Sequence, residues 1–172
     1  MSTTKQKCIF LDRDGVINRD KVDYVWKPEE LFIIDGVPQA LKDLKKAGYL
    51  LVIITNQSGI AKGLFKKSDV MNIHSLVQEV ADNSLDDIYM APHHESVHNS
   101  LSRKPGSLMF ERAIAKYNID PTQSWMIGDK ERDLIPGKKF GMKTILVDNL
   151  KESSYADHYA ENLLAASEII LK

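Results

Sequence analysis

The chain has 172 residues, the length of one domain, and a formal net charge of −1. Hydrophobic residues make up 43% of it and charged residues 27%, proportions typical of a globular protein with its own core. The nearly neutral charge argues against nucleic-acid or membrane partners, and no apolar run approaches the roughly 18 residues of a membrane span. We therefore expect a single domain over 1–172, a monomer in the cytoplasm, and, with Cys8 as the one cysteine, no internal disulfide.

The first predicted element is a short apolar run, Cys8 to Leu11, which stops at Asp12-Arg13-Asp14-Gly15. This pattern predicts a buried strand followed by a turn. Side chains two positions apart on an extended chain point to the same side, so Asp12 and Asp14 should share one small volume. Two carboxylates that close repel each other unless a cation or a shared proton is present. A nucleophilic carboxylate, a second one for proton transfer and a hard cation together indicate phosphoryl transfer through an aspartyl-phosphate.

Residues 20–27 show little periodicity and follow directly after the two aspartates. They are either a flap over the site or a surface connection in which Tyr24 and Trp26 only pack down, and the sequence leaves both interpretations open. Gly36-Val37-Pro38 then predicts the start of a helix that Gly48 ends.

The rest of the chain predicts strands that alternate with helices. Strands are expected at 49–55, 88–90, 125–127 and 144–147, and helices from Ser68-Asp69 onward and at 107–117, 134–140 and 163–171. Pro136 should restrict its helix to a late or bent start, and 148–160 should be irregular. The buried stripe of the second helix is expected to comprise Val70, Met71, Ile73, Leu76, Val77 and Val80. This alternation predicts a doubly wound α/β fold with a mostly parallel sheet, in which ligands bind beyond the strands' carboxyl ends.

Four motifs stand in an order that resembles the haloacid dehalogenase (HAD) superfamily of phosphatases. They are D-x-D-G-V at 12–16, the threonine at 55, the lysine at 104 and G-D-x-x-x-D at 128–133. The longer strings F-L-D-R-D-G-V-I-N, T-N-Q-S-G-I-A-K-G, P-H-H, R-K-P and I-G-D-K resemble the branch of histidinol-phosphate phosphatase and D-glycero-D-manno-heptose 1,7-bisphosphate phosphatase. The resemblance implies a HAD-like, Rossmannoid domain, and the intervals between the motifs leave no room for a large cap domain.

The resemblance also assigns catalytic roles. Asp12 would attack phosphorus, and Asp14 would protonate the leaving oxygen and then activate water. Lys104 would balance the charge of the intermediate. Mg²⁺ would be held by Asp12, by the backbone carbonyl of Asp14 and by Asp129.

The same resemblance places Thr55 and the Asn56 amide on a phosphate oxygen, and Arg103 and Lys130 near the substrate. Thr55, Arg103 and Lys130 each have a plainer interpretation. Thr55 could be an ordinary strand-end hydroxyl, Arg103 and Lys104 a solvated basic pair, and Lys130 a salt-bridge partner of Asp129 or Asp12. Asp133 is expected to be a helix-start or supporting carboxylate and not a direct metal ligand.

The chain departs from this branch in the loop before R-K-P, where relatives carry a structural zinc on C-x-H and C-x-C. Here the loop reads Ala91-Pro92-His93 and Ser100-Leu101-Ser102, so the three thiolates are absent. A structural zinc needs about four nitrogen or sulfur ligands, and we expect none to bind. A rebuilt site on His93, His94 and His98 remains the alternative.

The resemblance thus implies Mg²⁺-dependent hydrolysis of a small phosphorylated metabolite. A sugar bisphosphate such as D-glycero-D-manno-heptose 1,7-bisphosphate is the leading substrate, and histidinol phosphate is the alternative. A phosphotransferase or mutase remains open, as does a protein of another class that binds phosphate or acts as a scaffold without catalysis.

Overall fold

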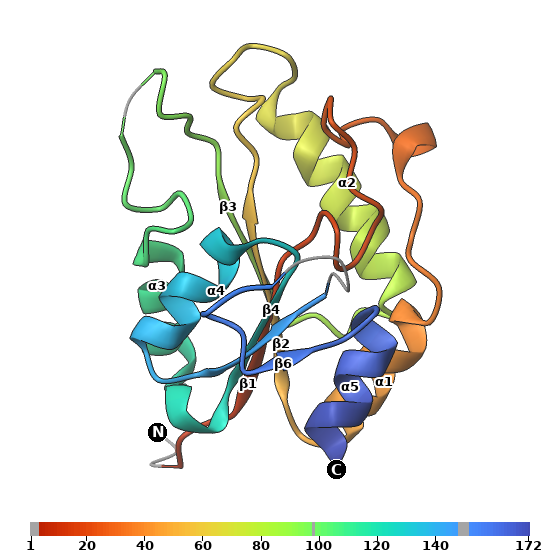
Figure 1. Cartoon of the computed structure of the whole chain (residues 1–172). Helices are drawn as coiled ribbons and strands as arrows, with labels where there is room; N and C mark the ends of the chain where they lie inside the picture. Colours follow the sequence, from red (N-terminus) through yellow and green to blue (C-terminus); the bar gives the residue numbers. More distant parts are fainter. Residues whose placement is uncertain (1–3, 98, 148–151) are drawn as a thin grey trace.

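The structure is a computed structural model and describes residues 4–97, 99–147 and 152–172. Within these residues, six parallel strands form one central sheet (Figure 1). Their spatial order is β3-β2-β1-β4-β5-β6. The strands are β1 (Cys8–Leu11), β2 (Leu50–Asn56), β3 (Asp87–Ala91), β4 (Trp125–Gly128), β5 (Lys143–Leu146) and β6 (His158–Tyr159). The doubly wound α/β prediction is confirmed, with every strand pair parallel.

Helices cover both faces of the sheet. The helices are α1 (Val37–Lys46), α2 (Lys67–Val80), α3 (Leu108–Tyr117), α4 (Glu131–Lys139) and α5 (Leu163–Leu171), with single 3-10 turns at Pro28–Glu30 and Pro121–Gln123. In Figure 1, α3 and α4 lie on one side of the sheet, and α1, α2 and α5 lie on the other. No helix among the described residues is long and apolar enough to cross a membrane.

The two cores follow from the alternation of side chains along the buried strands. In β1, Ile9 and Leu11 belong to the core shared with α1, α2 and α5, while Cys8 and Phe10 belong to the core shared with α3 and α4. All four side chains are fully buried. A strand covered on both faces needs a continuous apolar run, which is the pattern of this segment.

The strand register brings the polar segments together at one edge. Leu11 at the end of β1 pairs with Ile53 on β2 and with Ile127 on β4. The Asp12 N–H extends this pairing by donating to the Ile127 carbonyl over 3.0 Å. The residues that follow β1, β2 and β4 therefore meet beyond the carboxyl end of the sheet.

The expected late start of the helix after β4 is wrong. The helix begins at Glu131 and includes Pro136 in its interior. The Asp133 carboxylate accepts from the Lys130 N–H over 3.1 Å and anchors the first turn, so the helix is established before the proline. Pro136 removes one helical hydrogen bond, but the residue is buried within the fold.

Two smaller expectations also fail. The segment expected to be irregular contains β6, which pairs with Ile145 and Leu146; the part of it at 148–151 lies outside the described residues. A strand of two residues has no periodicity that a sequence could reveal. On α2, Met71 is 49% exposed and Val80 is 37% exposed. Met71 lies about 100° around the helix from the buried Val70, and a buried histidine, His74, takes a place on the stripe.

Candidate active site

A buried lysine joins two carboxylates at the carboxyl end of the sheet. The Lys104 Nζ lies 2.9 Å from Asp12 Oδ1 and 2.8 Å from Asp133 Oδ1, and it donates to the Ile54 carbonyl over 2.6 Å. All three charged side chains are buried. A charge removed from water requires such partners, because unpaired it would cost several kcal/mol. Lys104 is therefore part of the site and not a solvated surface charge.

The charges of this group shift one another's pKa values. Burial, with the charge of Asp133, raises the pKa of Asp12 to about 6, although Lys104 opposes the shift. Burial alone would lower the pKa of Lys104, but the two neighbouring carboxylates raise it above its ordinary value. The lysine therefore stays charged, and its charge favours ionised Asp12.

Asp129 completes a group of three carboxylates that could hold a metal ion. Asp12, Asp129 and Asp133 each offer an oxygen, and these oxygens lie within 4.8 Å of one another. Burial and the charge of Asp12 raise the pKa of Asp129. Its Oδ1 is buried without a hydrogen-bond partner, while its Oδ2 lies 3.0 Å from Lys130 Nζ. A cation is the partner that this crowding of negative charge calls for.

Gly15 makes this approach of the two loops possible. Its φ is +90°, and a Cβ built on it would lie 2.5 Å from Asp129 Cγ. Only glycine satisfies both the backbone conformation and the contact. The D-x-D-G signal thus reflects packing between the β1 and β4 loops as well as a turn.

Asp14 lies at the same carboxyl end of the sheet, and side chains of three residues donate hydrogen bonds to it. Its carboxylate accepts from Arg13 at 2.9 and 3.0 Å, from Asn18 Nδ2 at 2.9 Å and from Gln57 Nε2 at 2.9 Å. Its side chain is 19% exposed, in contrast to Asp12 at 6%. The Asp12 carboxylate is therefore buried with Lys104, whereas the Asp14 carboxylate faces the opening of the site.

Asp12 and Asp14 line a cavity of about 340 Å³, and four residues of the 20–27 loop line it as well. These four are Asp20, Lys21, Val22 and Tyr24. The flap interpretation is therefore confirmed, and we call residues 20–27 the flap. The packing interpretation also holds in part, because Trp26 stacks on Phe65 with ring centroids 5.8 Å apart.

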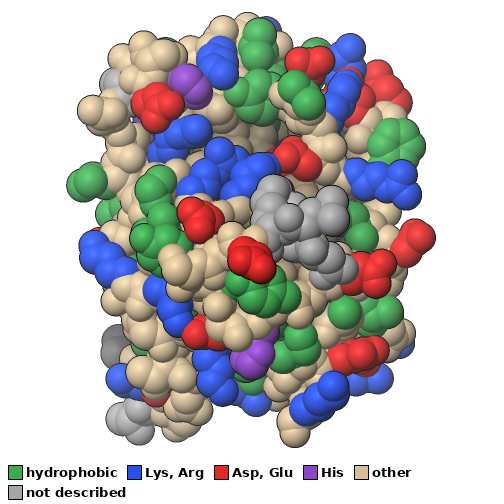
Figure 2. Space-filling model, viewed as in Figure 1, with side chains coloured by type: hydrophobic (Ala, Val, Ile, Leu, Met, Phe, Trp, Pro, Cys, Tyr) green, Lys and Arg blue, Asp and Glu red, His purple; other side chains and the backbone are tan. Residues whose placement is uncertain are grey.

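Cations gather at the mouth of this cavity. Lys130 pairs with Asp20 at 2.6 Å and with Asp129 at 3.0 Å, so the alternative of a salt bridge to Asp129 is confirmed while Lys130 still lines the cavity. Arg103 and Arg132 line it too. Figure 2 shows one contiguous group of Lys and Arg side chains in the upper half of the face in view, with Asp and Glu side chains beside it, and further Lys and Arg side chains scattered over the lower half.

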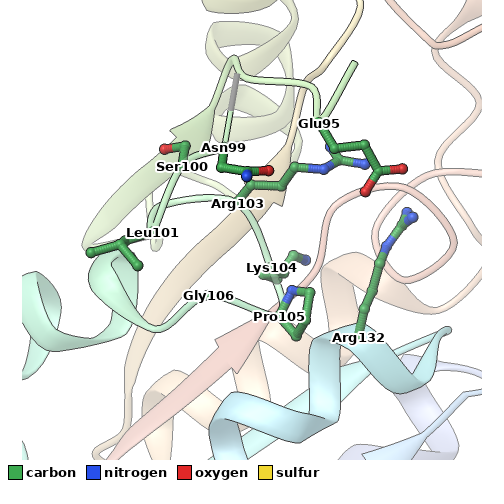
Figure 3. Close-up of a pocket in the computed structure, with 9 residues that line it drawn as sticks. All are labelled: Glu95, Asn99, Ser100, Leu101, Arg103, Lys104, Pro105, Gly106 and Arg132. Carbon is green, nitrogen blue, oxygen red and sulfur yellow. The ribbon is translucent and has the colours of Figure 1, made fainter. Parts of the chain in front are cut away.

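A second cavity of about 550 Å³ adjoins the first. It shares Arg103 and Arg132 with the first cavity, and Glu95 and Leu101 also line it. In Figure 3, Arg132 extends from the start of α4 toward the loop that carries Glu95 and Arg103. The Arg132 Nε is buried without a hydrogen-bond partner. Two guanidinium groups thus stand between the two cavities.

Thr55 and Asn56 lie behind the cavity wall more than in the opening. Thr55 is 1% exposed, and its hydroxyl accepts from Gln57 Nε2 over 2.9 Å. The Asn56 side chain lines the cavity but exchanges two hydrogen bonds with the backbone of Lys104, at 2.9 and 3.1 Å. The Asn56 side chain thus joins the end of β2 to the loop that carries Lys104.

The sequence assigned no site contact to several residues that lie at the site. They are Arg13, Gln57, Arg132 and the Tyr24–Ser58–Lys62 group, in which the Tyr24 hydroxyl lies 3.1 Å from Ser58 Oγ and accepts from Lys62 Nζ over 2.9 Å. The contiguous strings D-R-D-G and T-N-Q-S-G contain Arg13 and Gln57. Their positions within these strings were the available clue, but which atoms they bind depends on tertiary contacts.

Hydrogen bonds join neighbouring residues in the loop after β3. Ser100 Oγ and Ser102 Oγ lie 2.8 Å apart, and His94 Nδ1 lies 2.7 Å from Ser96 Oγ. His94 also lines the catalytic cavity. His98 lies outside the described residues, and among the described ones no histidine belongs to a group able to hold a metal. The absence of zinc stays a prediction.

Comparison with known proteins agrees with the geometry. A HAD-hydrolase-like family model matches residues 101–166. The D-glycero-beta-D-manno-heptose-1,7-bisphosphate 7-phosphatase of Haemophilus influenzae is 46% identical over 141 residues, covering 76% of this chain and 75% of the relative. The D-glycero-alpha-D-manno-heptose-1,7-bisphosphate 7-phosphatase of Campylobacter jejuni is 37% identical and covers 91% and 90%.

A solved structure extends the similarity to the fold. The D,D-heptose 1,7-bisphosphate phosphatase from B. bronchiseptica, in complex with magnesium and phosphate, superposes with a TM-score of 0.88 at 31% identity. The match covers 96% of this chain and 98% of that one. Sequence and architecture therefore point to the same group of enzymes.

Proposed function

The chain belongs to the HAD-like phosphatases, in the family of the heptose-1,7-bisphosphate 7-phosphatases, and on that premise we propose that it removes the 7-phosphate of D-glycero-D-manno-heptose 1,7-bisphosphate. The observation that carries the proposal is the buried group of Asp12, Lys104, Asp129 and Asp133 beneath a cavity with cations at its mouth. A dianionic phosphoryl group is attracted by such cations, and a carboxylate at the base of the cavity is placed to attack it.

Asp12 is the proposed nucleophile. Its Oδ1 accepts from the Arg13 N–H at 2.7 Å and from Lys104 at 2.9 Å. The carboxylate is thus oriented through one oxygen, and Oδ2 is the atom that would attack phosphorus. The P–O bond to the leaving group breaks as the Asp12–phosphorus bond forms, and Lys104 offsets the added negative charge.

Asp14 is the proposed acid and base. It would give a proton to the leaving sugar oxygen and then remove a proton from the water that hydrolyses the aspartyl-phosphate. Its exposure toward the cavity and its three hydrogen-bond donors suit this role, because the group must reach both reacting oxygens from one orientation.

Mg²⁺ is the proposed cofactor, and the residues present fit it. The buried, unpartnered Asp129 Oδ1 and the crowded carboxylates make a hard oxygen donor set. Asp12, Asp129 and the Asp14 backbone carbonyl would hold the ion, with Asp133 committed to Lys104 and to the start of α4. When bound, the ion would supply positive charge to the phosphate oxygens.

The two arginines between the cavities favour a bisphosphate over histidinol phosphate. A second phosphate would meet Arg103 and Arg132, whose guanidinium groups offer it paired hydrogen-bond donors. Histidinol phosphate would bring an ammonium group to the same place, where like charges repel. We further propose that the flap and the 91–102 loop, in place of a cap domain, control access to this site.

The direct test is phosphate release from the alpha and beta anomers of the bisphosphate, with ³¹P NMR identifying the ester that is cleaved. We expect loss of the 7-phosphate with Mg²⁺ and none after EDTA. Asp12→Asn should lower turnover by about 10⁴-fold or more, since an amide cannot attack phosphorus. Preferred hydrolysis of histidinol phosphate would overturn the substrate, and an inactive wild type with every phosphate ester, including aryl phosphates, would overturn the activity. Transfer to an added alcohol would indicate a phosphotransferase.

A further inference from the structure

Arg13 stands between the two aspartates in sequence, yet its side chain is fully buried. A guanidinium removed from water must be paired and hydrogen-bonded. Its Nε donates to Asp14 Oδ1 over 3.2 Å, and its Nη2 lies 2.9 Å from Oδ1 and 3.0 Å from Oδ2. Arg13 is therefore committed to the carboxylate of Asp14 and does not line the cavity.

The same Nη2 also donates to the backbone carbonyl of Val25 over 2.9 Å. Val25 belongs to the flap and is 1% exposed. The two other donors to Asp14, Asn18 and Gln57, bind elsewhere: Asn18 Nδ2 to the Arg19 carbonyl and Gln57 Nε2 to Thr55. Among the described donors to Asp14, only Arg13 connects the carboxylate to the flap.

The flap is anchored on both sides of that carbonyl. Tyr24, with a φ of +68°, places its hydroxyl against Ser58 and Lys62. Trp26 stacks on Phe65 with an interplanar angle of 17°. A non-glycine residue at positive φ persists only where its surroundings hold it. These two anchors therefore determine where the Val25 carbonyl lies.

We propose that Arg13 is a positioning residue that couples the flap to the orientation of the Asp14 carboxylate. When the flap is seated, the Val25 carbonyl fixes the guanidinium, and the guanidinium holds Asp14 toward the leaving oxygen. When the flap is displaced, this restraint on Asp14 is lost. The proposal rests on the acid role given to Asp14 under the proposed function, but not on the identity of the sugar.

The first test is Arg13→Lys, which keeps the charge and loses the planar fork. Its kcat/KM should be measured over aryl and alkyl phosphates of rising leaving-group pKa, since kcat/KM reports formation of the aspartyl-phosphate. We expect a loss of a few-fold for 4-nitrophenyl phosphate and of about 10²-fold for alkyl phosphates, the effect of a misplaced catalytic group. Equal losses across the series would overturn the proposal.

The second test asks whether the effect of Arg13→Lys requires the Asp14 carboxylate. In an Asp14→Asn background, Arg13→Lys should cause no further loss of kcat/KM, because both changes act through one proton transfer. A loss that adds to that of Asp14→Asn would mean that Arg13 acts through general stability of the fold and would overturn the proposal.

Trp26→Ala keeps the proposal falsifiable if Arg13 variants do not fold. Trp26 does not line either cavity beside Asp12, and its removal frees the flap without touching the buried charges. We expect the same dependence on the leaving group, again absent in the Asp14→Asn background. A loss that is uniform over the leaving groups, or none at all, would overturn the coupling. Because aryl and alkyl phosphates suffice, failure of heptose bisphosphate as a substrate would be a separate result.

Discussion

The base and the rim of the cavity use charge in opposite ways. We call Asp12, Lys104, Asp129 and Asp133 the base cluster, and Tyr24, His94, Arg103, Lys130 and Arg132 the rim. The exposed fraction of the base residues is 0% to 8%, whereas each rim residue is partly exposed. In the base, each buried charge is stabilised by the charged groups next to it. At the rim, the charged side chains remain partly exposed to solvent.

The difference decides what each region can do. Removal from water strengthens interactions between charges, so the base cluster can orient a nucleophile and stabilise charge on phosphorus. It cannot tolerate the loss of a member, because the remaining charges would be buried without a partner. Rim charges are screened by solvent and can change with less effect on folding. The base therefore suits the common chemistry of phosphoryl transfer, and the rim suits discrimination between substrates.

The substitution Lys104→Met tests the difference between base and rim most directly. It leaves Asp12 and Asp133 buried without their shared cation, so we expect the free energy of unfolding to fall by about 3–5 kcal/mol. Turnover should fall by about 10²-fold or more in the folded fraction, because the charge opposite the phosphoryl group is lost. Urea unfolding and steady-state kinetics measure the two effects. The control is Lys130→Met at the rim, which should cost less than Lys104→Met, because the Lys130 side chain is 34% exposed and its pairs with Asp20 and Asp129 are partly screened by solvent. Equal costs for the two lysines would contradict the contrast.

Arg132→Gln tests the rim. It should lower kcat/KM for the bisphosphate by about tenfold, since one charged contact to the second phosphate is lost. Hydrolysis of a sugar monophosphate should change little. Arg112→Gln on the exposed side of α3 removes the same charge away from the cavities and serves as the matched control. Parallel losses with both phosphate substrates would show that Arg132 supports the reaction and not the choice of substrate.

His74 is a buried group that is neutral at about pH 7. Burial and the positive charge of Arg13 lower its pKa to about 4, and its Nε2 has no hydrogen-bond partner. In the unfolded chain a histidine has a pKa of about 6.5, so between these values the unfolded state binds more protons. The free energy of unfolding should therefore fall as pH drops through this window, by up to about 1.4 kcal/mol per pH unit, and show no such dependence above it.

His74→Leu should remove that part of the acid-side slope, because leucine takes up no proton. Urea unfolding of wild type and variant at about pH 7 and about pH 5 provides the comparison. Carboxylates that titrate over the same range are common to both proteins, so the difference in slope belongs to His74. Identical slopes would show that His74 is protonated in the fold.

The smallest expected effect concerns zinc at the rim loop. The positions of the absent thiolates are occupied by Ala91, Ser100 and Ser102, and the two serines bond to each other. A zinc chelator that spares Mg²⁺ should therefore leave the melting temperature unchanged, and metal analysis should find no stoichiometric zinc. About one zinc per chain would show that His93, His94 and His98 rebuild the site.

Much of the fold was predictable because its signals are local. The apolar runs before Asp12 and Thr55 predicted strands, and the helix at 163–171 was predicted with the bounds of α5. Consecutive residues carry this information, because burial on both faces of a sheet requires an unbroken apolar run. The same logic predicted that Asp12 and Asp129 would meet at one edge, since both follow parallel strands.

What only the tertiary structure decided is which charges are paired. Asp12 and Asp14 look equivalent in the sequence, but Lys104 binds one and Arg13 the other. Asp133 carries a helix-start signal, and its bond to Lys104 joins the first turn of α4 to the loop before α3, which no local pattern connects. Arg132 and β6 are likewise defined by neighbours distant in the chain. The sequence determined the fold class and the residues that meet at the site, because these depend on periodicity and strand ends. The division into a buried base and an open rim depends on long-range contacts, which set the burial and hence the strength of every charge.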